Sequence, residues 1–569
     1  MSRTQKMGLF LAIGLLLWAP TVFASDTRHP AGWDVQVRQR VAADFNPDPD
    51  IVEVFLVAYP AYVRLSPHGP RTKVWTYNGS IPGPRIEGKV GDRVIVHFVN
   101  LLPEATTIHW HGLEVPAHMD GSNIAQGAIA AGATFRYEFT LLSPATYWYH
   151  PHIRSNEQVE RGLYGTLIVR DPQEDAQLHL PTHELQLMLD DILLDKRNKV
   201  AEAFPQDPLA NAETQLNGRE GNALLVNGRH TPTVLVRSGV PVRMRLINPS
   251  NARFMRISIP GHRLWRVGGD GGLVEHPIAI NPIDLIADPD GSGNMISDPN
   301  LDVGLLLVPG ERADVVFTPR GHASRTVPVE WHDFPRGRHS LFYRPDGTIG
   351  LGDAPDDGKR PPVTLMHLRF VGGGNPDAAE YIPPANLRSI PPIDVTGASP
   401  IPSVFGHTPP NAAGDVTFFV QMKDGAPLPF AAVTPEDAPT VFIGETRIWQ
   451  VVNLTGGDHP FHPHGFFFQH LDTQYIDLDN PANNRIEPAG RVENKDTIRL
   501  PKRPGAGGGR SRTITRLAMR FDDTGREGEL EAFGKIPGDG FSGGWIFHCH
   551  ILEHADRGMM SFINSLSPQ

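Results

Sequence analysis

The sequence predicts an all-β protein made of three β-sandwich domains. Glycine and proline occur 57 and 54 times among the 569 residues, and long helical periodicity is scarce. Frequent turn formers with little helical pattern favour many short strands. Three successive blocks of domain size repeat the order strand, turn, strand, which indicates a repeated sandwich unit. A chain of this length also exceeds a single ordinary core.

The first 24 residues are typical of an export signal. Arg3 and Lys6 precede an apolar run over residues 8–18, which is too short to span a membrane. Residues 22–24 (Val-Phe-Ala) fit a cleavage site, and the lack of an Arg-Arg pair favours the general secretory route. We therefore expect cleavage after residue 24, no membrane span in the mature protein, and a periplasmic or secreted location. An uncleaved anchor is the alternative.

The first sandwich domain is expected over residues 50–172. Alternation typical of strands begins at residue 51, and residues 74–85 run from a strand into a proline-rich turn. Residues 93–100 predict a strand rich in β-branched side chains, and further strands are predicted at 135–141 and 165–170. The acidic, polar residues 171–177 are predicted to be a linker.

The second sandwich domain is expected over residues 180–372. Strands are predicted on both sides of an Asn227-Gly228 turn, and another at 310–318. This block contains no His-x-His pair. Residues 333–362 are rich in glycine, proline and aspartate, and we expect them to form a surface insertion.

A proline-rich linker is predicted over residues 373–412, followed by the third sandwich domain over 413–569. Residues 445–453 and 544–547 predict strands that each lead directly into a histidine cluster. Residues 502–516 are basic and glycine-rich, which favours a mobile, solvated loop.

Ten histidines fall into four clusters, and the only cysteine lies inside one of them. Neutral imidazole and thiolate are ligands that copper prefers. A single thiol allows no disulfide within the chain, and its two histidine neighbours point to a metal thiolate. The clusters are His109-Trp110-His111, His150-Pro151-His152, His459-Pro460-Phe461-His462-Pro463-His464, and His548-Cys549-His550 followed by His554 and Met559.

Strand geometry explains the spacing within the clusters. Side chains on a strand alternate between faces, so the two histidines of each His-x-His pair point the same way. Three pairs (His109 with His111, His150 with His152, His462 with His464) offer six imidazoles, and His548 with His550 adds a fourth pair. Since one copper takes about three or four ligands, eight imidazoles suit a cluster of several metals.

Cys549 lies between two of these histidines and therefore points to the opposite face. There it could meet His459 and His554, with Met559 as a weak axial ligand. Two histidines, one thiolate and a distant methionine define a blue-copper electron-transfer site. The isolated histidines His118, His230, His262 and His470, and Met560 beside the axial candidate, are expected to be surface or packing residues.

At these residues the sequence resembles the three-domain multicopper oxidases, the family of laccases and bacterial cuprous oxidases. The motifs are His-Trp-His-Gly, Tyr-Trp-Tyr-His-Pro-His, His-Pro-Phe-His-Pro-His-Gly and His-Cys-His-Ile-Leu-Glu-His. The resemblance covers nearly all of the mature chain. It implies three cupredoxin-like Greek-key β-sandwich domains in one chain and four copper ions: one type 1, one type 2 and two type 3.

The resemblance also implies the role of each ligand. Every ligand position is filled, which separates the chain from copper-free relatives; two-domain nitrite reductases lack the type 3 set. The implied type 1 ligands are His459, Cys549, His554 and Met559, the type 2 ligands are His109 and His462, and the type 3 ligands are His111, His150 and His550 for one copper and His152, His464 and His548 for the other.

Carboxylates near the clusters are the candidates for moving protons. The resemblance places an acid near the copper cluster at Asp120, for which we expect a relay of protons to bound oxygen; a turn aspartate before Gly121 is the alternative. Bacterial cuprous oxidases often carry a second acid directly after the last type 1 histidine. Here that residue is Ala555, so Glu553, Asp556 or water would replace it.

The implied reaction is the one-electron oxidation of a phenolic or aromatic donor coupled to reduction of oxygen to water, with Asp120, Cys549 and His459 as catalytic residues. The alternative is an envelope metal oxidase acting on Cu(I), Mn(II) or Fe(II). The 12 methionines are scattered and the 333–362 insertion holds none, which weakens the cuprous-oxidase alternative. A copper-binding protein without turnover is a third interpretation.

Two further expectations concern partners and the donor. The net charge of −11 argues against a nucleic-acid partner, and we expect a monomer. Asp458 could hydrogen-bond a phenol or bind a metal ion, so it does not discriminate between the donor classes.

Overall fold

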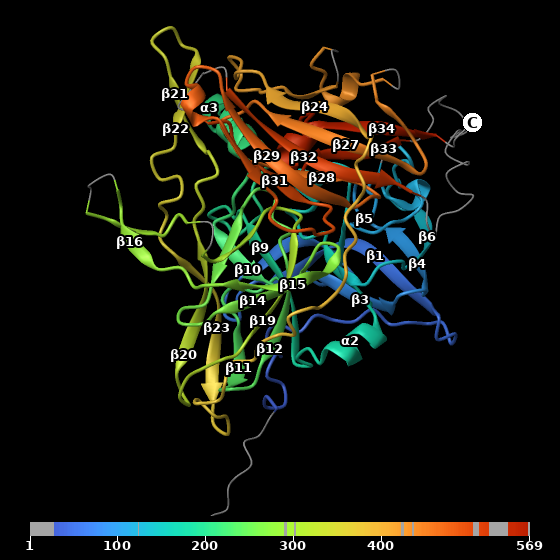
Figure 1. Cartoon of the computed structure of the whole chain (residues 1–569), viewed down its shortest axis with the longest axis vertical. Coiled ribbons are helices and arrows are strands. Elements are labelled where there is room, and N and C mark those ends of the chain that lie inside the picture. Colours follow the sequence, from blue (N-terminus) through green and yellow to red (C-terminus); the bar gives the residue numbers. More distant parts are fainter. Residues whose placement is uncertain are drawn as a thin grey trace, which may run out of the picture.

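The computed structural model describes residues 28–122, 124–289, 293–300, 303–422, 426–434, 437–504, 511–522 and 544–566. The expected export signal, residues 1–24, lies outside the described residues. Within the described ranges, no helix is long and apolar enough to cross a membrane. Strands dominate, and they form three pairs of sheets that follow one another along the chain, coloured blue, green and orange to red in Figure 1. The predicted all-β fold of three sandwiches is confirmed.

The first sandwich packs sheet β2-β1-β4-β6 against sheet β3-β8-β7-β5 around a core of aliphatic and aromatic side chains. Two short helices, α1 (Ser155–Gln158) and α2 (Pro172–Leu178), follow its last strands. Its strands are β1 (Ile51–Arg64), β2 (Arg71–Tyr77), β3 (Gly83–Lys89), β4 (Arg93–Asn100), β5 (His109–His111), β6 (Thr134–Thr140), β7 (Ala145–His150) and β8 (Gly165–Arg170).

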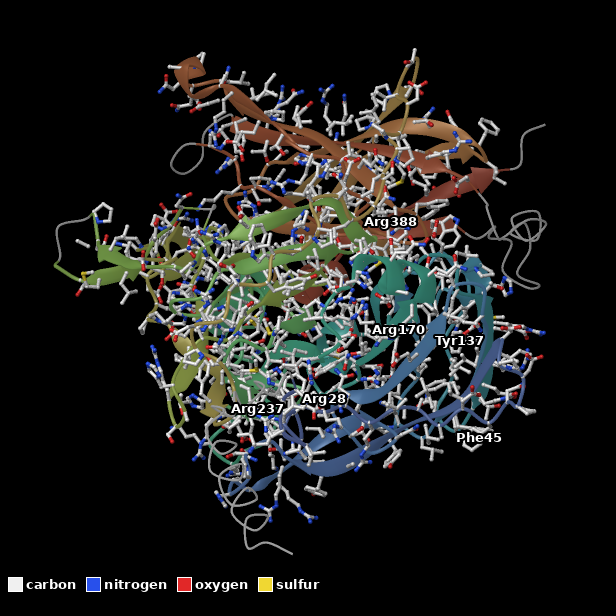
Figure 2. The ribbon with its side chains drawn as sticks, turned by 60° about the horizontal axis from the view of Figure 1, so that its bottom comes forward. Arg28, Phe45, Tyr137, Arg170, Arg237 and Arg388 are labelled. Atoms are coloured by element: carbon white, nitrogen blue, oxygen red, sulfur yellow. The ribbon has the colours of Figure 1, made fainter. Side chains whose placement is uncertain are left out.

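The segment 171–177, expected to be a linker, is mostly helix α2. The Asp171 carboxylate accepts hydrogen bonds from the backbone N–H groups of Gln173 and Glu174, and Pro172 occupies the first helical position. An N-cap aspartate followed by proline is a helix-start signal, and composition alone concealed it. Nearby, Arg170, which is labelled in Figure 2, pairs with Glu184 at 2.9 Å and so ties the first sandwich to the second.

The second sandwich packs sheet β10-β9-β12-β19-β14-β15 against sheet β11-β23-β20-β13-β18. Helix α3 (Pro208–Asn217) and two hairpins, β16 (Leu285–Ala287) with β17 (Met295–Ser297) and β21 (His339–Tyr343) with β22 (Ile349–Asp353), extend from it. Its strands are β9 (Glu184–Ile192), β10 (Ala223–Val226), β11 (Thr233–Arg237), β12 (Val242–Ile247), β13 (Met255–Ser258), β14 (Leu264–Gly269), β15 (Gly272–Ile280), β18 (Leu305–Leu307), β19 (Arg312–Phe317), β20 (Thr326–His332) and β23 (Val363–Val371).

The third sandwich packs sheet β25-β24-β27-β32-β29-β30 against sheet β26-β34-β33-β28-β31, and the short helix α4 (Leu552–Asp556) follows β33. Its strands are β24 (Ser399–His407), β25 (Phe418–Met422), β26 (Thr440–Phe442), β27 (Glu445–Asn453), β28 (His459–Pro463), β29 (Phe468–Asp477), β30 (Arg485–Pro488), β31 (Ile498–Leu500), β32 (Ser511–Phe521), β33 (Gly544–Cys549) and β34 (Met560–Leu566).

Two expectations about connecting segments differ from the structure. Part of the expected linker 373–412 forms β24, which pairs in parallel with β27 inside the third sandwich. Residues 511–516 of the expected solvated loop 502–516 belong to β32, where buried threonines alternate with more exposed arginines, while residues 505–510 lie outside the described residues. In both cases pairing with neighbouring strands determined the conformation of the segment, and neither its proline content nor its charge predicts that pairing.

Candidate metal centre

Eight histidines meet where the first sandwich faces the third. Strands β5 and β7 pair with His109 opposite His150, and β28 and β33 pair with His462 opposite His548. Since each His-x-His pair lies on one face of its chain segment, all four pairs converge. All eight side chains are buried. We call this group, His109, His111, His150, His152, His462, His464, His548 and His550, the histidine cluster.

Several imidazoles in the histidine cluster face one another at close range. Nε2 of His109 lies 3.4 Å from Nε2 of His462. Nε2 of His548 lies 3.2 Å from Nε2 of His464 and 3.3 Å from Nε2 of His152. The rings of His111, His150 and His550 lie with centroids 5.0 to 5.8 Å apart.

The hydrogen bonds made by the second nitrogen of each ring show where the proton and the lone pair of that ring lie. Nδ1 of His109 donates to the backbone oxygen of Asp120 at 2.8 Å, and Nδ1 of His462 donates to that of Asp496 at 2.7 Å. A neutral imidazole has one N–H, so both Nε2 atoms carry lone pairs that face each other. The same holds for His464 and His548, whose Nδ1 atoms donate to Asp120 Oδ2 and to the Cys549 carbonyl. Facing lone pairs repel unless a cation lies between them, so the cluster fits metal ions.

Burial favours the neutral form of seven of the eight rings. Desolvation is the largest cause that lowers the pKa of most cluster histidines well below the ordinary value, and it lowers the pKa of His548 to about 4. Neighbouring imidazoles lower them further. A neutral ring is the form that binds a metal, so the site is prepared for metal at neutral pH.

A second group lies on the other face of β33, inside the third sandwich. Cys549 Sγ lies 3.4 Å from His459 Nδ1 and 3.6 Å from His554 Nδ1, and these two nitrogens are 3.2 Å apart. We call these three residues the His–Cys site. The prediction that Cys549 points away from its neighbouring histidines agrees with this placement, because adjacent strand residues face opposite sides.

Hydrogen bonds aim both histidines of the His–Cys site at the sulfur. His459 Nε2 donates to Thr455 Oγ1 at 2.7 Å, and His554 Nε2 donates to the Leu216 carbonyl of helix α3 at 3.2 Å. The lone pairs therefore sit on the two Nδ1 atoms beside Cys549. Burial lowers the pKa of His459 to about 3 and raises the pKa of the Cys549 thiol, so a bound cation is needed to hold the thiolate.

Met559 lies in the same buried core as Cys549, and its carbonyl accepts a hydrogen bond from the Cys549 N–H at 3.0 Å. Met560 packs instead against Ile546 and Ala555, as expected for a packing residue.

Two buried carboxylates support the histidine cluster from outside. Asp120 Oδ2 accepts from His464 Nδ1 at 2.8 Å, and its Oδ1 lies 3.2 Å from His109 Nδ1. Asp496 Oδ1 lies 3.2 Å from His111 Nε2 and is held by Arg312, whose two terminal nitrogens each lie 2.5 Å from one of its oxygens. Sequence reasoning missed Asp496 and gave no role to Arg312, although residues 310–314 (Gly-Glu-Arg-Ala-Asp) resemble a family feature, because neither residue lies near a histidine motif.

The candidates for a second acid differ in their surroundings. The Glu553 carboxylate accepts from Asn251 Nδ2 at 2.8 Å and lies 3.7 Å from the Arg219 guanidinium. The Asp556 carboxylate accepts from the Asn156 N–H at 2.8 Å and lines a cavity of about 720 Å³ that reaches His152. Of the two, Asp556 is the acid that a molecule in this cavity would contact.

The remaining sequence candidates lie outside both groups. Asp458 is buried, and its carboxylate is engaged by Arg499 and by the Lys502 N–H. His118 and His230 are exposed, and His262 is buried with both ring nitrogens hydrogen-bonded to backbone. His470 contacts Thr473.

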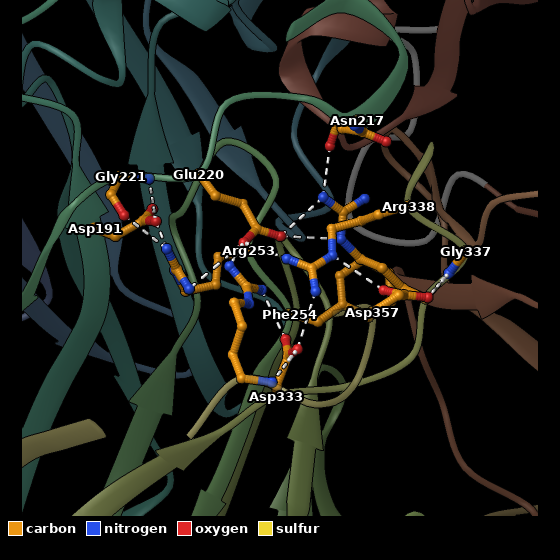
Figure 3. Close-up of polar contacts among 12 residues, drawn as sticks. Asp191, Asn217, Glu220, Gly221, Arg253, Phe254, Asp333, Gly337, Arg338 and Asp357 are labelled. Atoms are coloured by element: carbon orange, nitrogen blue, oxygen red, sulfur yellow. Dashed lines mark hydrogen bonds and ion pairs between the residues drawn. The ribbon is translucent and has the colours of Figure 1, made fainter. Parts of the chain in front are cut away.

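A cluster of arginines anchors the chain beside the His–Cys site. The largely buried Glu220 carboxylate lies 2.6 to 3.8 Å from four guanidinium groups, and these hold its pKa well below its usual range (Figure 3). The Arg336 carbonyl accepts a hydrogen bond at 2.7 Å from the N–H of Asp458, the residue directly before His459. We call Glu220 with Arg253, Arg336, Arg338 and Arg360 the Glu220 cluster.

Three sandwiches and two buried groups of metal-ligand side chains together define a metal-binding redox protein. Sequence models of the multicopper oxidase family match residues 61–174, 188–287 and 536–566. The multicopper oxidase MmcO of Mycobacterium tuberculosis is 26% identical over 89% of this chain and 86% of its own length, and a laccase of Bacillus subtilis is 25% identical over 88% and 91%.

Structural comparison shows a shared fold. A multicopper oxidase from Campylobacter jejuni, described as a metallo-oxidase, superposes with a TM-score of 0.69 over 94% of this chain and 97% of its own, at 24% identity. The chain belongs to the multicopper oxidase family, so it is an oxidoreductase with copper cofactors.

Proposed function

We propose that the chain couples one-electron oxidation of phenolic or aromatic donors to the four-electron reduction of oxygen to water. The observation that carries this proposal is the histidine cluster, whose neutral imidazoles direct facing lone pairs at one another at 3.2 to 3.4 Å. Four coppers would be held: type 1 by His459, Cys549, His554 and Met559, type 2 by His109 and His462, and type 3 by His111, His150 and His550 and by His152, His464 and His548.

Copper bound at these positions supplies the electron transfer from the donor and the reduction of oxygen. The chain contributes the connection and the fixed geometry. Cys549 of the His–Cys site is joined by peptide bonds to His548 and His550, so one strand end links both groups. Thr455 and Leu216 orient the two histidines beside Cys549, and a rigid site avoids reorganisation during electron transfer.

Asp120 is the acid we propose for delivering protons to oxygen. Its carboxylate is buried and contacts the rings of His464 and His109. A proton that reaches this carboxylate is therefore next to the histidine cluster. Asp120 also ends a turn, because its N–H donates to the Ala117 carbonyl at 3.0 Å, and a Cβ at the following Gly121 would lie 2.0 Å from the Ile108 carbonyl oxygen. Both interpretations of Asp120 given by the sequence are therefore compatible with its surroundings.

The surroundings of His459 support an organic donor over a metal ion. A cavity of about 1170 Å³ reaches Gly456 and Asp458, directly before His459, which is large enough for an aromatic molecule. Five arginine or lysine side chains line it beside four carboxylates, so the cavity has no excess of negative charge to attract a divalent cation. The metal-oxidase alternative is supported by relatives such as the iron transport multicopper oxidase FetC of Epichloe festucae. That protein is 26% identical over 88% of this chain.

Oxygen uptake by the copper-loaded protein tests the proposal. A methoxyphenol and Cu(I) are compared under matched conditions, and copper content is measured alongside. Faster turnover of the phenol with about four coppers per chain supports the proposal. Faster turnover of Cu(I) would make the chain a metal oxidase, and uptake with neither donor would leave copper binding without turnover.

We also propose that residues 1–24 are removed during export, so that the mature protein takes up copper in the periplasm or outside the cell and acts as a monomer. Mass spectrometry of the protein recovered from those compartments should give an N-terminus at Ser25. An intact residue 1 would contradict cleavage.

A further inference from the structure

The donor cavity beside His459 has walls from two domains. One wall is the β21–β22 hairpin, which carries His339, Leu351 and Asp353 from the second sandwich. The other is formed by residues of the third sandwich, including Tyr475 and Arg499. The segment 333–362, expected to be a surface insertion, therefore shapes the approach to the His–Cys site.

The hairpin wall is fixed in place. Gly337 at its base has φ +86°, and a Cβ there would lie 2.0 Å from the Gly456 carbonyl, so only glycine allows this close approach. The Glu220 cluster holds Arg336 and Arg338 on either side of Gly337 (Figure 3). A donor entering the cavity thus meets a wall that is already formed.

Most of the negative charge in the cavity is neutralised. Asp357 pairs with Arg338 at 3.0 Å, and Asp458 pairs with Arg499 at 2.9 Å. Glu487 pairs with Arg485 at 2.9 Å. The remaining lining acid, Asp353, is exposed at the end of the hairpin.

Lys502 differs from these paired residues. Among the described residues, its ammonium contacts only the Pro335 carbonyl, at 3.2 Å, and no carboxylate. Its aliphatic stem crosses over Gly337, where a Cβ would lie 2.9 Å from Lys502 Cδ. An ammonium has three donors, so at least two remain for a ligand. The Lys502 backbone N–H donates to the carboxylate of Asp458, and Asp458 directly precedes His459 in the chain. Lys502 is therefore linked to His459 through one residue.

An aromatic platform lies in the same cavity. The Arg485 guanidinium lies over the Tyr475 ring with 3.5 Å between its carbon and the ring centre. A guanidinium is planar, and it binds carboxylates as well as aromatic rings.

We propose that this cavity selects aromatic donors that carry a carboxylate or sulfonate, with Lys502 as the residue that recognises the anionic group. This inference rests on the proposed function, since it names the donor class of the same site. The net charge of −11 repels anions over the molecule as a whole, so a local preference for anions needs a cation without a counter-ion, and Lys502 is placed to provide it.

Equilibrium binding tests the inference apart from turnover. Calorimetry compares 3,4-dimethoxybenzoate with its uncharged counterpart 1,2-dimethoxybenzene on the copper-loaded protein. The anion is expected to bind more tightly, and Lys502→Met, which keeps the stem over Gly337, should lower the preference for the anion about tenfold. Lys502→Arg should restore most of it. The exposed Lys196→Gln serves as the matched control and should leave the preference unchanged.

The outcomes separate the two proposals. Equal binding of both compounds, or an unchanged preference in Lys502→Met with intact blue colour and copper content, would overturn the role of Lys502. Kinetics with 4-hydroxy-3-methoxybenzoate and 2-methoxyphenol then test turnover: anion-selective binding without oxidation of either phenol removes the proposed function and leaves the binding site standing. Oxidation of both phenols without selective binding of the anion would support the proposed function and overturn the role of Lys502.

Discussion

Asp120 Oδ2 lies 2.8 Å from Nδ1 of His464, while the backbone oxygen of the same aspartate accepts a hydrogen bond from Nδ1 of His109. One residue of the first sandwich therefore orients one histidine from its own domain and one from the third. A group that hydrogen-bonds a metal-binding histidine usually fixes the orientation of the ring and also raises its basicity as a ligand.

Replacing Asp120 should slow oxygen reduction without affecting electron uptake from the donor. For Asp120→Ala we expect a loss of about 10- to 100-fold in oxygen consumption, since His464 loses its acceptor. The blue colour should still bleach at the normal rate when donor is added without oxygen. Asp120→Asn keeps an acceptor but cannot carry a proton, so an equal loss in both variants indicates proton delivery. Asp377→Asn, at an exposed position, is the control; oxygen reduction that is unchanged in the alanine variant would rule out both roles.

Met559→Leu should raise the reduction potential of the His–Cys site. The two side chains are similar in volume, so the buried core is retained while the thioether is lost. Redox titration of the blue absorption band measures the change, and faster oxidation of poorly reducing phenols should accompany it. Met560→Leu, which alters the neighbouring packing residue, should leave the potential where it is. A potential that is the same in both variants would show that Met559 is not the axial ligand.

Glu220→Gln should destabilise the protein and loosen the donor cavity. The substitution leaves four arginines, of which Arg253 and Arg336 are buried, without their common counter-ion; removing one partner of a buried ion pair costs about 3–5 kcal/mol. We expect a lower melting temperature and a higher KM for the donor, with copper content retained. Glu213→Gln, on the exposed face of helix α3, should change neither. Identical melting curves for Glu220→Gln and the parent would contradict the anchoring role.

Stability should fall as pH rises because of Asp190. Burial, and then the neighbouring Asp191, raise the pKa of Asp190 to about 8, whereas the unfolded chain ionises near 4. Between these values the folded state keeps a proton that the unfolded state has lost, so each rise in pH favours unfolding, by at most about 5 kcal/mol in total. Asp190→Asn removes this dependence and should gain stability over the parent at pH 8 more than at pH 5. Thermal unfolding at both pH values measures it, and an equal difference at the two would show that Asp190 is ionised in the folded protein.

Sequence alone predicted the parts of the site that depend on local geometry. His109 and His111 share a face because strand side chains alternate, and Cys549 faces away from His548 and His550 for the same reason. These relationships hold along one strand, and the spacing in the chain is enough to infer them. The fold class followed similarly, from turn formers and strand patterns that act over a few residues.

Tertiary structure decided what depends on strands meeting from distant parts of the chain. Asp496 and Arg312 support His111 from 385 and 201 positions away, Leu216 of helix α3 orients His554, and Lys502 crosses the base of a hairpin from another domain. No local period relates such residues, since their contact arises only when separate sandwiches pack. The sequence therefore determined which metal chemistry the chain supports, while the packing of three domains decided which nitrogens face one another, which carboxylates hold them, and what the donor meets on its way to His459.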